Sequence, residues 1–205
     1  MTLTWLEDGP EDGPRLALAH GAGAAMDSDF MNVMAAGVGK AGIRVVRFEF
    51  PYMQAQRKDG RRRRPDPPKV LQASWREVID RLGGGSALVI GGKSMGGRIA
   101  SMLADEVEAR GLVCLGYPFH PAGRPEKTRV EHLRELETPA LFVQGTRDTM
   151  GSREDVAGYT LSDRIELCWL EDGDHSFKPR KKSGRTLEQA MDEAVEVVVA
   201  FMRAR

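Results

Sequence analysis

The segment 92–96, Gly-Lys-Ser-Met-Gly, has the residue types and spacing of a nucleophilic serine held in a sharp turn. It follows the apolar run 87–90 and opens the helical pattern 98–104. A serine at the tip of a strand-to-helix turn sits in strained backbone, and glycines on either side remove the steric conflict. Backbone N–H groups at the start of the helix can stabilise a developing oxyanion. The segment therefore predicts Ser94 as a nucleophile with half of an oxyanion hole.

A phosphate-binding loop is the main rival interpretation of this segment, because Gly92-Lys93-Ser94 also matches the end of that motif. The motif needs a glycine at position 87, where the chain has Ala87, and residues 88–90 have the composition of a buried strand. The nucleotide interpretation is therefore disfavoured. A chance glycine-rich turn fits the segment taken alone, so the rest of the chain must supply the partners of the serine.

The general base is sought among four histidines. His175 lies in a turn-rich loop after the strand-like run 165–170, where its side chain is free to reach a serine. His20 ends a predicted strand and begins an oxyanion-loop pattern, His120 follows another strand, and His132 lies in a charged helical stretch typical of a surface. His175 is accordingly the predicted base.

The acid is expected at a strand end between the serine and the histidine, the chain order of one large class of serine hydrolases. Residues 140–144 are predicted to form a buried strand, and Asp148 follows it within a few residues. Placed there, its carboxylate would accept the Nδ1–H of His175 and stabilise the imidazolium. Asp148 could instead only cap a turn. Asp155 is the second candidate, whereas aspartates adjacent to His175 are too near it in sequence.

The chain resembles the α/β-hydrolases. The matching segments, in chain order, are 20–23 (His-Gly-Ala-Gly), 91–98, 145–148 and 173–175. Within that superfamily it is similar to small lidless dienelactone-hydrolase-like proteins, and more closely to a hydrolase-like group with testis-expressed and chromatin-complex (NSL) relatives. The segments shared with that group are 50–52, the arginine run with Pro65, and 117–120.

The resemblance implies roles for individual residues: Ser94 as nucleophile, His175 as base and Asp148 as acid. It places the oxyanion hole at the N–H of Met95 and at one N–H of the loop after His20-Gly21, with Ala22 favoured and Gly23 or Ala24 as alternatives. Dienelactone hydrolases proper carry a cysteine where this chain has Ser94, so lactone hydrolysis is not implied.

Strand and helix patterns alternate along the chain. The predicted strands are 3–6, 15–19, 43–48, 87–91, 111–115, 140–144 and 165–170, and the predicted helices are 29–40, 67–82, 95–108, 129–136, 152–158 and 186–203. This alternation predicts one α/β domain over residues 1–205, a three-layer α/β/α sandwich with a mostly parallel sheet of six to seven strands. Ligands should bind at the carboxyl ends of the strands.

Two helix starts carry recognisable signals. Asp66 is expected to cap the helix that holds Pro67 and Pro68 in its first turn, and Thr186 with Gln189 forms a capping box for the last helix. Between the fifth strand and the next helix, residues 116–128 are too short and proline-rich for a helical lid. The site should therefore be open and suited to small acyl groups.

The basic run 57–65 contains four consecutive arginines and follows a predicted strand. It is interpreted first as a solvated or internally paired loop, second as an anion-binding rim that Lys178 would extend, and last as a nucleic-acid contact, which lacks interleaved aromatic residues. His120, Arg63 and Lys178 are the tentative substrate contacts. Lys93, beside the nucleophile, could belong to such a rim or form a buried ion pair.

Composition is consistent with one ordinary globular domain. The 205 residues carry 30 Lys and Arg against 30 Asp and Glu, so no global field favours nucleic acid. No secretory signal or membrane span is expected, and Cys114 and Cys168 fall in strands predicted to be buried, which suits a cytoplasmic protein with reduced thiols. No metal or cofactor is predicted, and the oligomeric state is left open.

These features together predict a serine hydrolase that cleaves a small carboxylic ester or thioester through an acyl-enzyme on Ser94. An anionic substrate is expected if the basic run forms a rim. Peptide substrates differ only in the leaving group and stay open. The alternative is an interaction module with little or no catalysis, because fold and motif do not establish a substrate.

Overall fold

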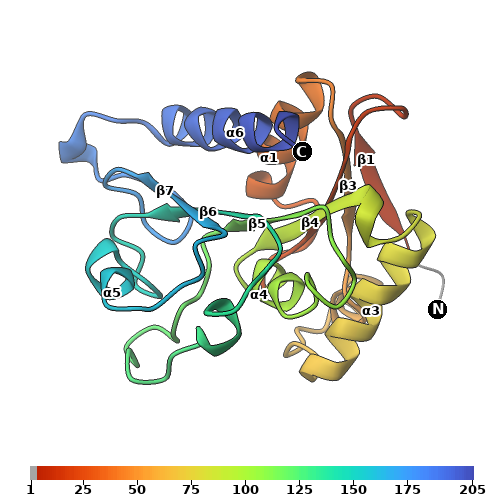
Figure 1. Ribbon diagram of the computed structural model, residues 1–205, viewed down its shortest axis with the longest axis horizontal. Coiled ribbons are helices and arrows are strands. Elements are labelled where there is room, and N and C mark those ends of the chain that lie inside the picture. Colours follow the sequence, from red (N-terminus) through yellow and green to blue (C-terminus); the bar gives the residue numbers. More distant parts are fainter. Residues whose placement is uncertain (1–3) are drawn as a thin grey trace.

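The computed structural model describes residues 4–205 and contains one seven-stranded sheet (Figure 1). The strands are β1 (Trp5–Asp8), β2 (Arg15–Ala19), β3 (Arg44–Phe48), β4 (Leu88–Lys93), β5 (Gly111–Leu115), β6 (Ala140–Gly145) and β7 (Ile165–Leu170). Their spatial order is β1-β3-β2-β4-β5-β6-β7. Only β1 runs antiparallel, against β3. Leu3, in the first predicted strand, lies outside the described residues.

Helices cover both faces of the sheet. They are α1 (Asp29–Lys40), α2 (Pro51–Asp59), α3 (Pro68–Arg81), α4 (Met95–Ser101), α5 (Arg153–Ala157) and α6 (Leu187–Arg203), with short 3₁₀ turns η1 (Gly85–Ala87), η2 (Glu131–Leu133) and η3 (Lys181–Ser183). Figure 1 shows α1 and α6 together on one face, and α3 and α4 on the other. The predicted three-layer sandwich is confirmed.

The two hydrophobic layers explain why the central strands are apolar throughout. Strands β4, β5 and β6 are buried along their whole length, because side chains on both pleat faces meet a helix layer. Trp75 of α3 packs edge-on against Phe48 on one face, with ring centroids 4.7 Å apart. On the other face α1 and α6 touch at Gly37, where an added Cβ would lie 2.8 Å from Val195.

Several predicted boundaries are wrong. The helix expected over 95–108 ends at Ser101 and continues as turns, and the one expected over 129–136 is only the 3₁₀ turn η2. Helix α2 was not predicted, because it buries only Tyr52 and Met53 and so has little hydrophobic periodicity. Cys168 is only partly buried, because β7 is an edge strand of the sheet.

The two predicted caps have different outcomes. The capping box of α6 is confirmed: Gln189 N donates to Thr186 Oγ1 at 3.1 Å, and Thr186 N donates to Gln189 Oε1 at 2.9 Å. Asp66 does not cap α3, whose preceding residue is Pro67. Its carboxylate instead accepts the N–H of Tyr52 at 2.9 Å, in the first turn of α2.

The carboxyl edge of the sheet is left uncovered by any inserted helix. Residues 116–128 form turns and bends without a helix or strand, as the prolines predict. His20, Ser94, Asp148 and His175 all follow the carboxyl ends of parallel strands, which is where this topology gathers ligands. None of the described helices is long and apolar enough to cross a membrane.

Candidate active site

Ser94 sits in the strained turn that its sequence predicts. It joins β4 to α4 with φ 50° and ψ −114°, a conformation that non-glycine residues rarely adopt. The turn packs directly on β2: a Cβ added to Gly92 or to Gly96 would lie 2.2 or 2.3 Å from the carbonyl oxygen of Ala19. Both flanking glycines are therefore required by close backbone approach.

His175 and Asp148 lie in line with Ser94. The distance from Ser94 Oγ to His175 Nε2 is 2.9 Å, and from His175 Nδ1 to Asp148 Oδ2 it is 2.7 Å. Because a carboxylate can only accept, Nδ1 carries the proton and Nε2 is left to accept the serine hydroxyl. The structure thus brings the three sequence-predicted residues together in the arrangement in which a histidine can remove the proton of a serine.

Both carboxylate oxygens of Asp148 accept hydrogen bonds from groups other than His175. Asp148 is fully buried; Gln144 Nε2 donates to Oδ2 at 2.8 Å, and Met150 N donates to Oδ1 at 2.8 Å. Gln144 in turn accepts the N–H of Tyr117 at 2.7 Å, which links β6 to the segment after β5. Sequence reasoning missed Gln144, although a glutamine at the end of an otherwise apolar strand was a visible signal.

Lys93 is neither a rim residue nor an ion-pair partner. Its buried ammonium donates to the main-chain carbonyl of His175 at 2.7 Å and lies 5.3 Å from the ring centroid of Phe30. Within residues 4–205 no carboxylate lies within 4.0 Å of it. Burial lowers the pKa of Lys93 to about 8, against the opposing pull of Asp148 and Asp174. Lys93 therefore ties the histidine loop to the end of β4.

The loop that carries His175 is fixed on both sides of the histidine. Asp174 Oδ1 accepts the N–H groups of Ser176 and Lys178 at 2.8 and 3.0 Å, which closes a tight turn. Phe177 is fully buried, with its ring centroid 5.2 Å from that of Phe30 on α1. The position of the imidazole is thereby set by its own loop before any substrate arrives.

The segment after β2 is anchored by the main-chain N–H of Phe50 and by the side chain of Tyr52. Phe50 N donates to His20 Nε2 at 3.2 Å, so His20 Nδ1 carries the proton and donates to Gly21 O at 2.7 Å. Burial lowers the pKa of His20, which keeps this ring neutral. The hydroxyl of Tyr52 donates to Ala22 O at 3.1 Å. Helix α2, missed by the sequence analysis, thus supports the loop that carries Ala22.

Two backbone N–H groups in the lining of the serine cleft have no acceptor among the described residues. Met95 and Ala22 line the same cleft as Ser94, and neither N–H donates to any acceptor among residues 4–205. Met95 is the first residue of α4, where a helix leaves its N–H groups free. Both N–H groups are therefore free of competing protein acceptors within residues 4–205.

The cleft beside Ser94, called here the Ser94 cleft, has a volume of about 400 Å³. Its lining is mostly apolar, with Leu71, Ile99, Met150 and several prolines; its charged residues are Asp66, Arg98 and Arg129. Neither arginine was singled out from the sequence. Arg98 lies one turn beyond Ser94 on α4, and that spacing was the available signal.

The three tentative substrate contacts do not line the Ser94 cleft. His120 is buried, bonds Pro121 O at 3.0 Å through Nδ1, and has Nε2 3.4 Å from Asp155 without hydrogen-bond geometry. Arg63 is paired with Asp59 at 2.7 Å, and Lys178 is exposed outside the cleft. Of the four consecutive arginines only Arg63 is paired with an acid; the other three are exposed, and none of the four lines the Ser94 cleft.

A second serine–histidine contact exists at Ser101 and His132, whose Oγ and Nε2 are 2.9 Å apart. Ser101 is buried in α4 and donates to Arg98 O at 2.8 Å, so its only proton is already used and His132 must be the donor. Within the described chain no carboxylate lies within 4.0 Å of His132. The contact lacks the arrangement for catalysis, and His132 is partly buried rather than a surface residue.

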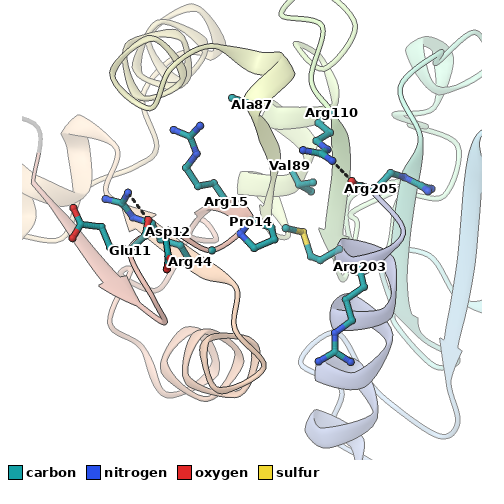
Figure 2. A pocket seen from close by; sticks show the side chains of 12 residues that line it. Glu11, Asp12, Pro14, Arg15, Arg44, Ala87, Val89, Arg110, Arg203 and Arg205 are labelled. Carbon is teal, nitrogen blue, oxygen red and sulfur yellow. Dashed lines mark hydrogen bonds between the residues drawn. The ribbon is translucent and has the colours of Figure 1, made fainter.

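A larger cavity, called here the amino-edge cavity, lies at the opposite end of the sheet and has a volume of about 720 Å³ (Figure 2). It is lined by residues before β2 and β5 and by the end of α6, with five arginines: Arg15, Arg44, Arg110, Arg203 and Arg205. None of the three residues of the Ser94 relay reaches it. In residues 4–205 no cluster of three or more His, Cys, Asp or Glu side chains is arranged to hold a metal ion.

Comparison with known proteins decides the family. A model described as an alpha/beta hydrolase domain matches residues 12–203. The chain belongs to the α/β-hydrolase family. The family match and the lidless neighbours below support that much of the sequence-based resemblance; the finer likeness to the testis-expressed and NSL relatives has no support among them.

Solved structures share the α/β-hydrolase fold over nearly the whole chain. An α/β serine hydrolase homologue from Coxiella burnetii has TM-score 0.68 and 18% identity, covering 97% of this chain and 90% of that one. A serine hydrolase without a lid from Xanthomonas campestris has TM-score 0.67 and 22% identity, covering 95% and 88%. A monoacylglycerol lipase from Paleococcus ferrophilus has TM-score 0.70 and 15% identity, covering 98% and 99%.

Proposed function

We propose that this α/β-hydrolase is a serine hydrolase that cleaves a small carboxylic ester or thioester through an acyl-enzyme on Ser94. The observation that carries the proposal is the hydrogen-bonded relay from Ser94 through His175 to the buried Asp148. The serine hydrolase and lipase among the structural neighbours have names consistent with this chemistry.

The geometry supports a two-step acyl transfer. His175 Nε2 takes the Ser94 proton as the oxygen attacks the carbonyl, and Asp148 stabilises the resulting imidazolium. The oxyanion would lie between the N–H groups of Met95 and Ala22, which have no competing protein acceptor in the described residues. The imidazolium then gives its proton to the leaving alcohol or thiol. A water molecule, deprotonated by His175, releases the acid and restores Ser94.

The shape of the Ser94 cleft limits the substrate. At about 400 Å³, with no helix over residues 116–128, it holds a short acyl group and leaves a long chain in solvent. Ester, thioester and peptide substrates differ in the leaving group, and no residue of the cleft lining discriminates among these leaving groups. An interaction module would need no ordered relay and no pair of free N–H groups beside it, so catalysis is the better explanation of this site.

The test is labelling of the purified protein with a fluorophosphonate probe, followed by peptide mass spectrometry. The label should be confined to Ser94, absent in Ser94→Ala, and retained in Ser101→Ala, the matched control that removes the other histidine-bonded serine. Label on Ser101, or no label in protein that is folded by circular dichroism, would reject the proposed nucleophile. Hydrolysis of short neutral esters by the labelled form would reject it as well.

A further inference from the structure

Two guanidinium groups in the Ser94 cleft have no anionic partner. Arg98 and Arg129 both line the cleft, and their side chains take part in no ion pair or hydrogen bond with any other described residue. Arg98 Nε is also buried without an acceptor. A buried donor that has lost water and gained no partner costs free energy, so this arrangement requires an explanation.

The two positive charges also act on each other. Burial lowers the pKa of Arg129, and the nearby charge of Arg98 lowers it further. Like charges that converge in a partly buried site destabilise the empty protein, and a bound anion would remove both the repulsion and the unsatisfied donors. A protein surface without function at this place would be more stable with neutral side chains.

Both arginines are mounted on fixed backbone close to the nucleophile. Arg98 N donates to Ser94 O at 3.0 Å within the first turn of α4, so about one turn of helix, ~5.4 Å, separates the two residues. Arg129 N donates to Phe119 O at 2.7 Å, and its carbonyl accepts the hydroxyl of Tyr117 at 2.9 Å. A ligand held by the two guanidinium groups therefore has a defined place relative to Ser94.

The remaining charge in the lining is a carboxylate. Asp66 accepts the N–H of Tyr52 and lies more than 4.0 Å from both guanidinium groups, because it forms no ion pair with either. It stays committed to the start of α2 and leaves the arginines unneutralised. Its negative charge disfavours an anion on its own side of the cleft and so favours one orientation of an anionic substrate.

We propose that the substrate of this hydrolase bears an oxyanionic group, a carboxylate or a phosphate, which Arg98 and Arg129 bind while Ser94 attacks the ester or thioester carbonyl. The substrate part of this inference rests on the proposed function. Planar guanidinium groups match the geometry of both oxyanions, and two of them offer more donors than one ligand can use. The site thus selects a small ester with an anionic tail, in place of a neutral lipid.

Direct binding tests the anion site without relying on catalysis. Isothermal titration of the wild-type protein with glutarate and with inorganic phosphate should show binding, and titration with glutaramide, the uncharged diamide, should show binding at least tenfold weaker. Binding of both anions should fall about 10- to 100-fold in Arg98→Gln and in Arg129→Gln, the range expected for hydrogen bonds to a charged group. The relative affinity of the two anions identifies which oxyanion the site prefers.

Arg203→Gln is the matched control, because it removes an arginine of the amino-edge cavity. It should leave anion binding unchanged. Loss of binding in that variant alone, or equal binding in all the variants, would overturn the assignment to the Ser94 cleft. Thermal melts of each variant establish that the comparison is made between folded proteins.

Kinetics test the link to the substrate. Monomethyl glutarate is compared with methyl 4-carbamoylbutanoate, and 3-carboxyphenyl acetate with 3-carbamoylphenyl acetate, so that an amide replaces the carboxylate on the acyl or on the leaving side. One of the two pairs should show a kcat/KM preference for the carboxylate of about 10- to 100-fold. That preference should disappear in Arg98→Gln and recover partly in Arg98→Lys, which restores the charge without the planar fork.

The preference is the ratio of kcat/KM for the carboxylate-bearing ester to that for the amide-bearing ester, measured with one preparation of one variant. A smaller amount of folded protein lowers both values equally and leaves the ratio unchanged. Hydrolysis of the amide-bearing esters without any carboxylate preference would refute the anionic substrate and leave the serine hydrolase intact. Anion binding without hydrolysis of any of the four esters and without labelling of Ser94 would refute the proposed function and leave only an anion site. The two failures are therefore distinguishable.

Discussion

The amino-edge cavity and the Ser94 cleft differ in how their arginines are satisfied. The amino-edge cavity is the larger, about 720 against 400 Å³, and has five arginines against two. Each of those five donates to an acceptor: Arg15 to Leu82 O, Arg44 to Glu7, Arg110 to Arg205 O, Arg203 to Ala41 O and Arg205 to Ala204 O. The bond from Arg110 to Arg205 O is drawn in Figure 2. In the Ser94 cleft neither guanidinium has such a partner.

The contrast shows that size and the number of charges do not locate a site in this protein. Arginines that donate to main-chain carbonyls close the ends of strands and helices, and their binding capacity is already used. What marks the Ser94 cleft is unused capacity: two free N–H groups, a relay ending at a serine, and two unpaired guanidinium groups. The following predictions test whether function follows that difference.

The largest effect is expected for Asp148→Asn. If the asparagine turns its oxygen toward His175, its NH₂ faces the Met150 N–H; if it turns the other way, its NH₂ faces His175 Nδ1 and Gln144 Nε2. Either way a donor meets a donor: the first arrangement also loses the charge that stabilises the imidazolium, and the second favours the wrong tautomer of His175. By analogy with the serine-protease triad, kcat for a short ester should fall by about 10⁴.

Asp155→Asn is the control, since Asp155 is the other acid that the sequence allows. Its carboxylate accepts Ser152 N at 3.0 Å and caps α5. This variant should lose about 1 kcal/mol of stability, measured by urea unfolding, and keep its kcat. Equal losses of kcat in both variants would show that Asp148 acts through the fold instead of through His175.

The next largest effect is expected in the pH dependence of the free energy of unfolding, through Lys93. The pKa of Lys93 is about 8 in the fold, against 10.5 for an ordinary lysine, so between these pH values the unfolded chain binds more protons. The free energy of unfolding contributed by Lys93 must then rise with pH, by about 3 kcal/mol from below pH 8 to above pH 10.5. Below pH 8 the buried charge is a constant cost.

Lys93→Met should remove this pH dependence. The measurement is urea unfolding of wild type and variant between pH 7 and 10.5, with the difference between the two free energies plotted against pH. Lys69→Met, which removes an exposed lysine of α3, serves as the control and should give a flat difference. A flat difference for Lys93→Met too would mean that its ammonium is hydrated and not held by His175 O alone.

A smaller effect is expected for the support of the oxyanion hole. Tyr52→Phe removes the hydroxyl that donates to Ala22 O, and with it part of the restraint on the Ala22 N–H. One neutral hydrogen bond is worth about 1 kcal/mol, so kcat for a neutral short ester should fall about five- to tenfold with little change in KM. A change confined to KM would place Tyr52 in substrate binding, and Tyr159→Phe provides a tyrosine control outside the cleft lining.

The residues predicted from sequence are those whose signals are local. The strands can be recognised in the sequence, and the serine turn, Asp148 and His175 each follow the end of a parallel strand within a few residues. Their common edge therefore follows from the parallel topology. Helix α2 was not predicted because only two of its residues are buried, so its sequence has little hydrophobic periodicity. The supporting roles of Lys93 and Tyr52 were not predicted because their partners are distant in sequence. Lys93 donates to the carbonyl of residue 175, and Tyr52 donates to that of residue 22.

Charge density in the sequence did not indicate which arginines line the Ser94 cleft; the basic run agrees with its first interpretation, a solvated or internally paired loop. The run of arginines is conspicuous, yet Arg63 is paired with Asp59 four residues away, and Arg57 with Glu49 and Asp27. Arg98 and Arg129 are 31 positions apart in ordinary surroundings, and only the fold places both in one cleft. Pairing depends on which acids lie nearby in space, and composition does not contain that information.

The smallest effect is expected from opening an ion pair at the amino edge. Glu7→Gln frees Arg44, whose side chain is 20% exposed while that of Glu7 is 35% exposed, so the lost pair should cost at most about 1 kcal/mol. The carboxylate of Glu7 has its pKa lowered chiefly by the hydrogen bond from Arg44. The stabilisation is therefore present above the ordinary carboxyl pKa and is lost as pH falls through the lowered value, and Glu7→Gln should erase that part of the acid dependence in urea unfolding.

Freeing Arg44 also separates two explanations of the Ser94 cleft. If an unpaired guanidinium were enough to bind anions, Glu7→Gln should create a second phosphate site at the amino-edge cavity, visible as a second set of sites in titration. We expect none, because Arg44 stays hydrated and still donates to Glu11 O at 3.2 Å. Arg98 differs in having a buried Nε without an acceptor among the described residues, and in lining the same cleft as a second guanidinium. An unpaired arginine that is exposed to solvent gains little from an anion. An unpaired arginine that is buried gains more, and this is why the Ser94 cleft is the expected anion site.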